Sequence, residues 1–135
     1  MATIPESIEK KKFLMDMIMK GKRDHTEDIL GSKMVLRVLD DAETTEAHKE
    51  ASGFDMVTRV IVLRKALLSR ALVSVSLVGS GEWIPQSVSE TAIFLGKLAP
   101  SLVEHIFNKY DAMVKFRDSE IELALKAEKD DTLKN

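Results

Sequence analysis

The N-terminal segment carries apolar side chains on more than one side of a predicted helix. A proline in the first turn and a glycine after the last turn predict a helix over residues 5–20. Met15, Ile18 and Met19 fall on one face of this helix, whereas Phe13 falls on another. This much apolar surface must be covered by the rest of the fold or by another molecule. We therefore identify Met15, Ile18 and Met19 as candidate partner-binding residues.

A polar segment separates this helix from the main domain. Residues 22–32 are polar and contain a glycine, which predicts a loop. Helix and loop together make residues 1–33 an N-terminal arm suited to docking on a partner. The apolar run at residues 34–39 predicts a strand, and it opens a domain that we place at residues 34–129. The last residues, 130–135, are charged and are expected to fray.

Capping signals mark two helices in the middle of the chain. Asp40 and Glu43 have the spacing of a capping box and predict a helix over residues 41–51. Asp55 can cap a longer helix over residues 56–74. Apolar residues recur along this second helix at three- and four-residue steps, which predicts a buried stripe. The stripe consists of Val57, Val60, Ile61, Leu67, Leu68, Ala71 and Leu72.

The pattern then changes from helical spacing to alternation. Residues 73–77 alternate between apolar and polar, residues 79–81 are a glycine-rich turn, and residues 82–84 can return as a partner strand. The pattern predicts a short β-hairpin over about residues 73–84.

Two more helices complete the prediction. Ser87 and Glu90 form a second capping-box signal before a helix over about residues 89–98. A proline opens the last helix, which we place at residues 101–129. The inward candidates of the first of these helices are Ile93, Leu95 and Leu98.

The elements together predict one α+β domain that is mainly helical, with four to five helices, a short hairpin and one further strand. The helices at 56–74 and 101–129 are expected to pack against each other through their Leu and Val stripes, with Leu68 and Ile106 in the core.

Composition narrows the class of protein. Of 135 residues, 44% are hydrophobic but only 5% aromatic, so aliphatic side chains must build the core. The formal net charge of −2 gives no overall attraction to nucleic acid or to an acidic membrane. No apolar stretch approaches a membrane span or the centre of a signal peptide, so we expect no membrane association and no export by that route. The absence of cysteine excludes disulfides, thiolate metal ligands and a cysteine nucleophile.

No pattern of residues suggests catalysis or a cofactor. The histidines, His25, His48 and His105, stand in different segments without metal-site spacing. The acidic residues around Asp40 are explained by helix capping, and the glycines at 79–81 lack the lysine of a phosphate loop. We expect no enzymatic activity, no cofactor and no metal site.

Two features suit binding. Trp83 either closes the core as a lid, the interpretation that we favour, or anchors a partner. A basic face on the helix at 56–74 could bind phosphate, although solvated basic faces are common and no aromatic residues are interleaved with it. That face consists of Arg59, Arg64, Lys65 and Arg70.

Several short phrases lie in an order that is similar to small tail proteins of tailed bacteriophages. They are an acidic, alanine-rich segment at 39–47, the phrase Ala-Leu-Leu-Ser-Arg-Ala-Leu-Val-Ser-Val at 66–75, a glycine hairpin at 78–82, the phrase Leu-Gly-Lys-Leu-Ala-Pro at 95–100 and Tyr-Asp-Ala-Met at 110–113. Over about residues 36–129 the chain resembles tail-assembly chaperones and baseplate-hub-related assembly proteins. This family has no motif that marks functional residues.

The resemblance implies a non-enzymatic role through protein–protein contacts. Expected partners are other tail or baseplate proteins, with self-association left open, either in the host cytoplasm during assembly or in the virion as a minor structural subunit. The alternative is a small helical nucleic-acid-binding regulator that uses the basic face from Arg59 to Arg70, and we regard nucleic-acid binding as the weaker hypothesis.

Overall fold

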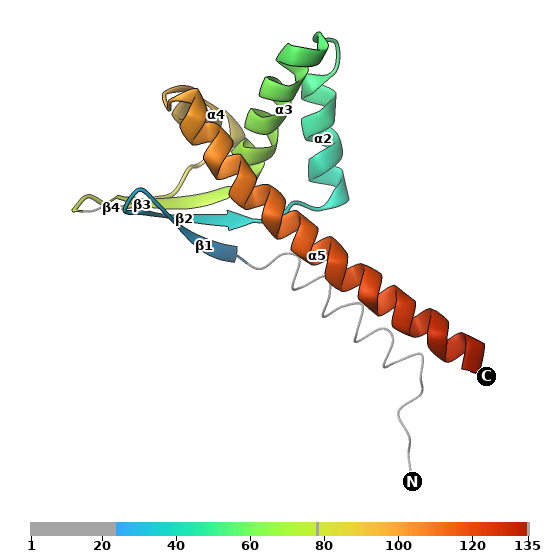
Figure 1. The fold of residues 1–135 in the computed structure, drawn as a ribbon. Helices are drawn as coiled ribbons and strands as arrows, with labels where there is room; N and C mark the ends of the chain where they lie inside the picture. The colour runs from blue at the N-terminus through green and yellow to red at the C-terminus, as the bar shows by residue number, and fades with distance from the viewer. Residues whose placement is uncertain (1–23, 78, 135) are drawn as a thin grey trace.

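Two β-hairpins join edge to edge into one antiparallel sheet. The computed structural model describes residues 24–77 and 79–134 (Figure 1). The predicted helix at 5–20 therefore lies outside the described residues, together with Met15, Ile18 and Met19. The sheet has the order β1-β2-β3-β4. Its strands are β1 (Asp24–Ile29), β2 (Ser32–Arg37), β3 (Leu72–Leu77) and β4 (Gly81–Trp83).

The first strand replaces most of the loop that the sequence predicted at 22–32. β1 pairs with β2 over its whole length, with Thr26 opposite Val35 and Ile29 opposite Ser32. The loop prediction was wrong because β1 is a polar edge strand. β1 pairs with β2 through backbone hydrogen bonds, which do not depend on the type of side chain. Its polar sequence therefore lacks the apolar alternation that would predict a strand. Only Ile29 in this strand is buried.

A β-bulge adjusts the register between β2 and β3. Val35 lies opposite Ser74, but the next residue, Leu36, lies opposite Leu72, so Val73 is the extra residue. The bulge allows Leu72 and Val75, three residues apart, both to be buried. Alternation alone would have placed Val73 on the core face in place of Leu72. The predicted hairpin is confirmed as β3 and β4, joined by a turn in which the Ser80 amide donates to the Leu77 carbonyl at 3.1 Å.

Four helices are seen in the described residues, and α2, α3 and α4 rise from the same side of the sheet (Figure 1). The predicted capping box of α2 is confirmed: the Glu43 amide donates to the Asp40 carboxylate at 2.8 Å, and the Asp40 amide donates to the Glu43 carboxylate at 3.4 Å. Asp55 caps α3 by accepting from the Thr58 amide at 2.8 Å. The helices are α2 (Asp41–Ala51), α3 (Met56–Ala71), α4 (Val88–Gly96) and α5 (Pro100–Lys134).

The helix α4 departs from its prediction in two details. The Ser87 hydroxyl accepts from the Glu90 amide at 3.1 Å, but the Glu90 carboxylate accepts from the Gln86 amide at 2.9 Å. In a regular capping box the Glu90 carboxylate would accept from the amide of Ser87; here it accepts from the residue before it, Gln86. Leu95 is buried as expected and Leu98 is half-buried, whereas Ile93 is 63% exposed. The helix is short and contacts the core along one narrow face. Ile93 lies outside this face.

One hydrophobic core joins the sheet to the helices. The most deeply buried large side chains come from β2, the segment after it, α3, α4 and α5: they are Leu36, Leu39, Leu68, Leu95 and Ile106. The expected places of Leu68 and Ile106 in the core are confirmed. The chain is thus a mainly helical α+β protein, with a four-stranded sheet in place of the single hairpin and extra strand that the sequence predicted.

Candidate partner-binding surfaces

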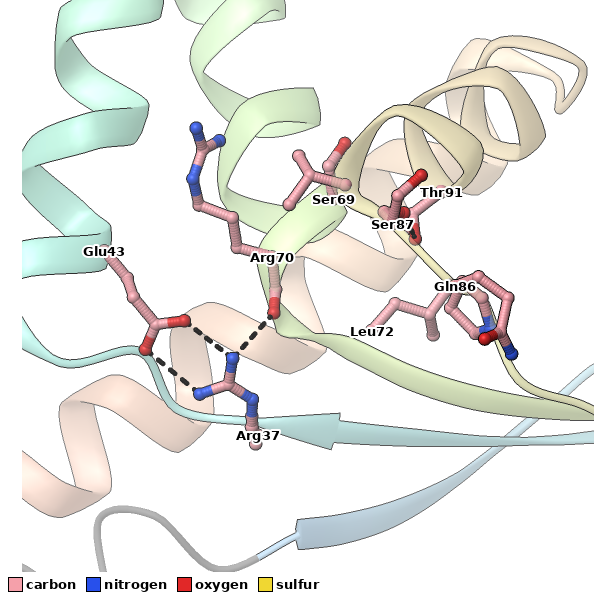
Figure 2. Close-up of a pocket in the computed structure, with 10 residues that line it drawn as sticks. Arg37, Glu43, Ser69, Arg70, Leu72, Gln86, Ser87 and Thr91 are labelled. Atoms are coloured by element: carbon pink, nitrogen blue, oxygen red, sulfur yellow. Dashed lines mark hydrogen bonds and ion pairs between the residues drawn. The ribbon is translucent and has the colours of Figure 1, made fainter.

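An open pocket of about 190 Å³ lies where β2, α3 and the segment before α4 meet (Figure 2). Arg37 at the end of β2 contributes its guanidinium to the pocket, and Glu43 on α2 faces it. The two side chains form a double contact, with nitrogen–oxygen distances of 3.0 and 2.6 Å. The hydrogen bonds that Arg37 donates to the Glu43 carboxylate are the main reason that the pKa of Arg37 is raised further above its ordinary value.

The second arginine of the pocket is also held within the chain. Arg70 pairs with the Glu50 carboxylate and donates to the Ala66 carbonyl at 2.9 Å. Its own carbonyl accepts from Arg37 at 3.4 Å, the contact drawn in Figure 2. Each guanidinium therefore already faces a carboxylate. The arrangement joins the end of β2 to α2 and α3, and it offers no uncompensated charge to an anion.

Two hydroxyl groups in the pocket wall are also hydrogen-bonded within the chain. The Ser69 hydroxyl donates to the Lys65 carbonyl, and the Thr91 hydroxyl donates to the Ser87 carbonyl at 3.2 Å. Both residues are buried. Among the described residues, neither hydroxyl is bonded to a histidine or a carboxylate that could act as a base.

The basic face that the sequence singled out is largely engaged in contacts within the chain. Arg59 donates to the Phe54 carbonyl at 3.1 Å, and the Arg64 guanidinium lies 5.6 Å from the centre of the Phe107 ring. Arg70 is paired in the pocket, and Lys65 is half-buried. Arg70 is thus paired with a carboxylate, whereas Arg59 and Arg64 contact a carbonyl oxygen and an aromatic ring.

Trp83 lies half-buried at the end of the second hairpin. Its ring packs against Phe94 with 4.9 Å between centroids, and it contacts the buried core from β4. This position agrees with the lid interpretation. A role of Trp83 in binding a partner stays a prediction.

The largest apolar exposure on α3 lies where the sequence predicted a buried stripe. In the first half of the helix Met56 is 82% exposed and Val57 is 75% exposed. Val57 is three and four residues from Val60 and Ile61, so their side chains adjoin on the helix surface. We call this surface the α3 apolar patch; it consists of Phe54, Met56, Val57, Val60 and Ile61.

The patch stays exposed although α2 lies beside α3. α2 packs beside α3 but buries only two small side chains, Ala47 and Ala51. The prediction of one continuous buried stripe was therefore wrong for the first half of α3 and right for Leu67, Leu68 and Ala71. The polar composition of α2 was the sequence signal that could have shown this.

Comparisons of the chain with protein-family models, curated proteins and solved structures find no match. Within residues 24–77 and 79–134, no group of three or more acidic or histidine side chains is placed to hold a metal ion. In the same part of the chain, no helix has an apolar stretch long enough to cross a membrane. His25, His48 and His105 are all exposed and lie on three different elements.

Proposed function

We propose that this protein works by binding another protein through the α3 apolar patch, in the assembly or structure of a bacteriophage tail or baseplate. The observation that carries the binding role is the patch itself, where four apolar side chains in the first half of α3 and Phe54 just before it are 44% to 82% exposed. Isolated apolar side chains are common on surfaces, but contiguous groups are typical of interaction sites. The setting in a phage tail rests on the sequence resemblance over about residues 36–129.

The scaffold around the patch suits a binding role. Asp55 fixes the start of α3 by capping it, and Arg59 closes onto the Phe54 carbonyl in the preceding segment. The second half of the same helix is anchored in the core through Leu68 and Ala71. A partner would therefore meet a largely preformed surface, which lowers the entropy cost of binding.

The test is co-purification of the full chain with the tail-tube, tape-measure and hub proteins of a tailed bacteriophage. The double variant Val57→Asp, Ile61→Asp should weaken binding by about tenfold or more, because it places two charges in an apolar contact. Its thermal unfolding midpoint should stay close to that of the wild type, since both side chains are at least half exposed.

The matched control is Ile93→Asp, which makes the same kind of change at an exposed position on α4. It should bind as the wild type does. Failure of the wild type to bind any of these proteins would refute the phage-tail setting. Equal binding by the wild type and the double variant would refute the assignment of the patch.

A further inference from the structure

The outward face of α5 carries apolar side chains beyond the part of the helix that is built into the core. Its 35 residues form one helix, about 52 Å long at the usual rise per residue. Arg117, halfway along, donates to the Leu39 carbonyl at 2.9 Å and ties the helix to the segment after β2. Phe116 is 65% exposed, and Leu123, two turns further on the same side, is 67% exposed. We call these two residues and the exposed Ala127 the α5 outer row.

The part of α5 that carries this row is acidic. Residues 118–130 contain five Asp and Glu against two Lys. Glu120 and Glu122 lie on either side of Leu123 around the helix. Neither carboxylate forms an ion pair within the described part of the chain. The α5 outer row is therefore an apolar row with uncompensated negative charge beside it.

The α3 apolar patch has the opposite charge around it. α3 contains four Lys and Arg, against one acidic residue in its cap, Asp55. Arg64 and Lys65 follow Ile61 by three and four residues and so border the patch, and Arg59 lies exposed within its length. Among the residues that the structure describes, none of these three cations is paired with a carboxylate. The patch is thus the electrostatic complement of the α5 outer row.

The arrangement of the helices prevents this contact within one copy of the chain. The patch lies at the start of α3, which is the end away from the sheet, because α3 runs directly into β3 at its other end. Figure 1 shows α5 passing the sheet and pointing away from the connection between α2 and α3. α5 is one continuous helix and does not turn back. Its acidic half can therefore meet a surface of this kind only on a second copy.

We propose that the α5 outer row of one copy docks on the α3 apolar patch of a second copy, with Leu123 packed against Val57 and Ile61. Two helices then cross with apolar rows in contact and opposite charges beside them. Each copy offers one surface of each kind, so the contact is head to tail and passes from copy to copy into a closed ring or an open chain. This inference rests on the proposed function in taking the patch as a binding surface, and it names a second copy as the protein bound there.

Sedimentation velocity on the purified full chain tests the contact. The mass of the wild type should rise with concentration beyond that of a dimer. The double variant Val57→Asp, Ile61→Asp alters the patch, and Leu123→Asp alters the outer row. Each should weaken association by about tenfold or more, because it places charge in an apolar contact. The matched control is Leu125→Asp, which should associate as the wild type does, since Leu125 is 54% exposed on the opposite side of α5 from Leu123.

A mixture of the two defective variants gives a sharper test. The double variant keeps its α5 outer row, and Leu123→Asp keeps its patch. Together they should form a one-to-one dimer that grows no further, because the two remaining surfaces are both defective. Far-ultraviolet circular dichroism checks that both variants stay as helical as the wild type.

Reversal of charge tests the electrostatic part of the contact without changing its apolar residues. Glu120→Lys with Glu122→Lys should weaken association by about fivefold, because two cations would then face the basic border of the patch. Asp28→Lys with Glu82→Lys makes the same change of charge at two exposed positions on the sheet and should leave association unchanged.

A wild type that stays monomeric at every concentration, or a mixture that forms no dimer, would overturn the inference. Association that survives the double variant or Leu123→Asp would also overturn it, because like surfaces would then be in contact. The proposed function is tested separately. Binding of a tail protein by a monomeric wild type would leave that function standing, whereas self-association without binding of any tail protein would refute the phage-tail setting alone.

Discussion

Tyr110 shows how a single buried polar atom can be satisfied where two segments meet. Its side chain is only 4% exposed, and its hydroxyl accepts from the Leu39 amide at 3.4 Å. Arg117, about two turns further along α5, donates to the carbonyl of the same residue, Leu39. The two side chains of α5 together satisfy both backbone groups of Leu39, which is itself buried and leaves the sheet at this point.

The burial of Tyr110 predicts a loss of stability at alkaline pH. Burial is the main reason that its pKa is raised above the ordinary value of about 10. As the pH rises through that value, the unfolded chain loses the phenol proton first, so it binds fewer protons than the folded chain. The free energy of unfolding therefore falls between the ordinary pKa and the raised pKa of the folded state.

Because Tyr110 is the only tyrosine, phenolate absorbance reports on it alone. The folded protein should titrate above the pH at which the urea-unfolded chain titrates. In Tyr110→Phe, the fall of stability with pH should be shallower than in the wild type. Identical titration in the folded and unfolded states would contradict this account.

At the scale of elements, the turn between β1 and β2 carries an unfavourable residue. Leu30 and Gly31 form the two-residue connection, with φ values of 52° and 82°. Both positions thus lie in the left-handed region, which suits Asn-Gly far better than Leu-Gly. Leu30 is 87% exposed, so no packing offsets the strain.

Replacement of Leu30 should therefore stabilise the hairpin. We expect Leu30→Asn to raise the free energy of unfolding by about 0.5–1 kcal/mol, because asparagine tolerates this backbone conformation. The matched opposite is Gly31→Ala, which should lower it by about 1 kcal/mol. A Cβ atom at Gly31 would meet nothing within 4 Å, so that loss reports the backbone alone. Chemical denaturation measures both changes, and a destabilised Leu30→Asn variant would refute this interpretation of the turn.

At the scale of the whole molecule, the described elements share one core. The buried cluster includes Ile29 from β1, Val75 from β3, Ala47 from α2 and Met113 from α5. Strands and helices both contribute side chains to this one cluster, so neither has a separate core. Sheet and helices should therefore unfold together.

Two core truncations test this dependence. We expect Leu68→Ala and Ile106→Ala each to lower the free energy of unfolding by about 2–5 kcal/mol, because both side chains are fully buried. Unfolding followed by Trp83 fluorescence and by far-ultraviolet circular dichroism should give the same midpoint in every variant. The exposed position Ile93 supplies the control, since Ile93→Ala should change stability by less than about 0.5 kcal/mol. Separate midpoints would show two independently folding parts.

Local signals in the sequence determined where most elements lie. Asp40 with Glu43, and Asp55, mark helix starts because capping depends on hydrogen bonds between residues three apart. The alternation before the glycine-rich turn marked the second hairpin, and the helical spacing placed Leu68 and Ile106 in the core. Each of these signals depends on residues that are close together in the sequence, so it can be recognised without the tertiary structure.

Tertiary structure alone decided the features that depend on neighbours distant in sequence. β1 exists because β2 supplies its backbone partners, and its polar side chains gave no sign of this. The bulge at Val73 depends on the register of two strands more than thirty residues apart. The α3 apolar patch is a surface because no described element packs over it. Periodicity identifies an apolar face, but only the packing of other elements decides whether that face becomes core or a binding surface.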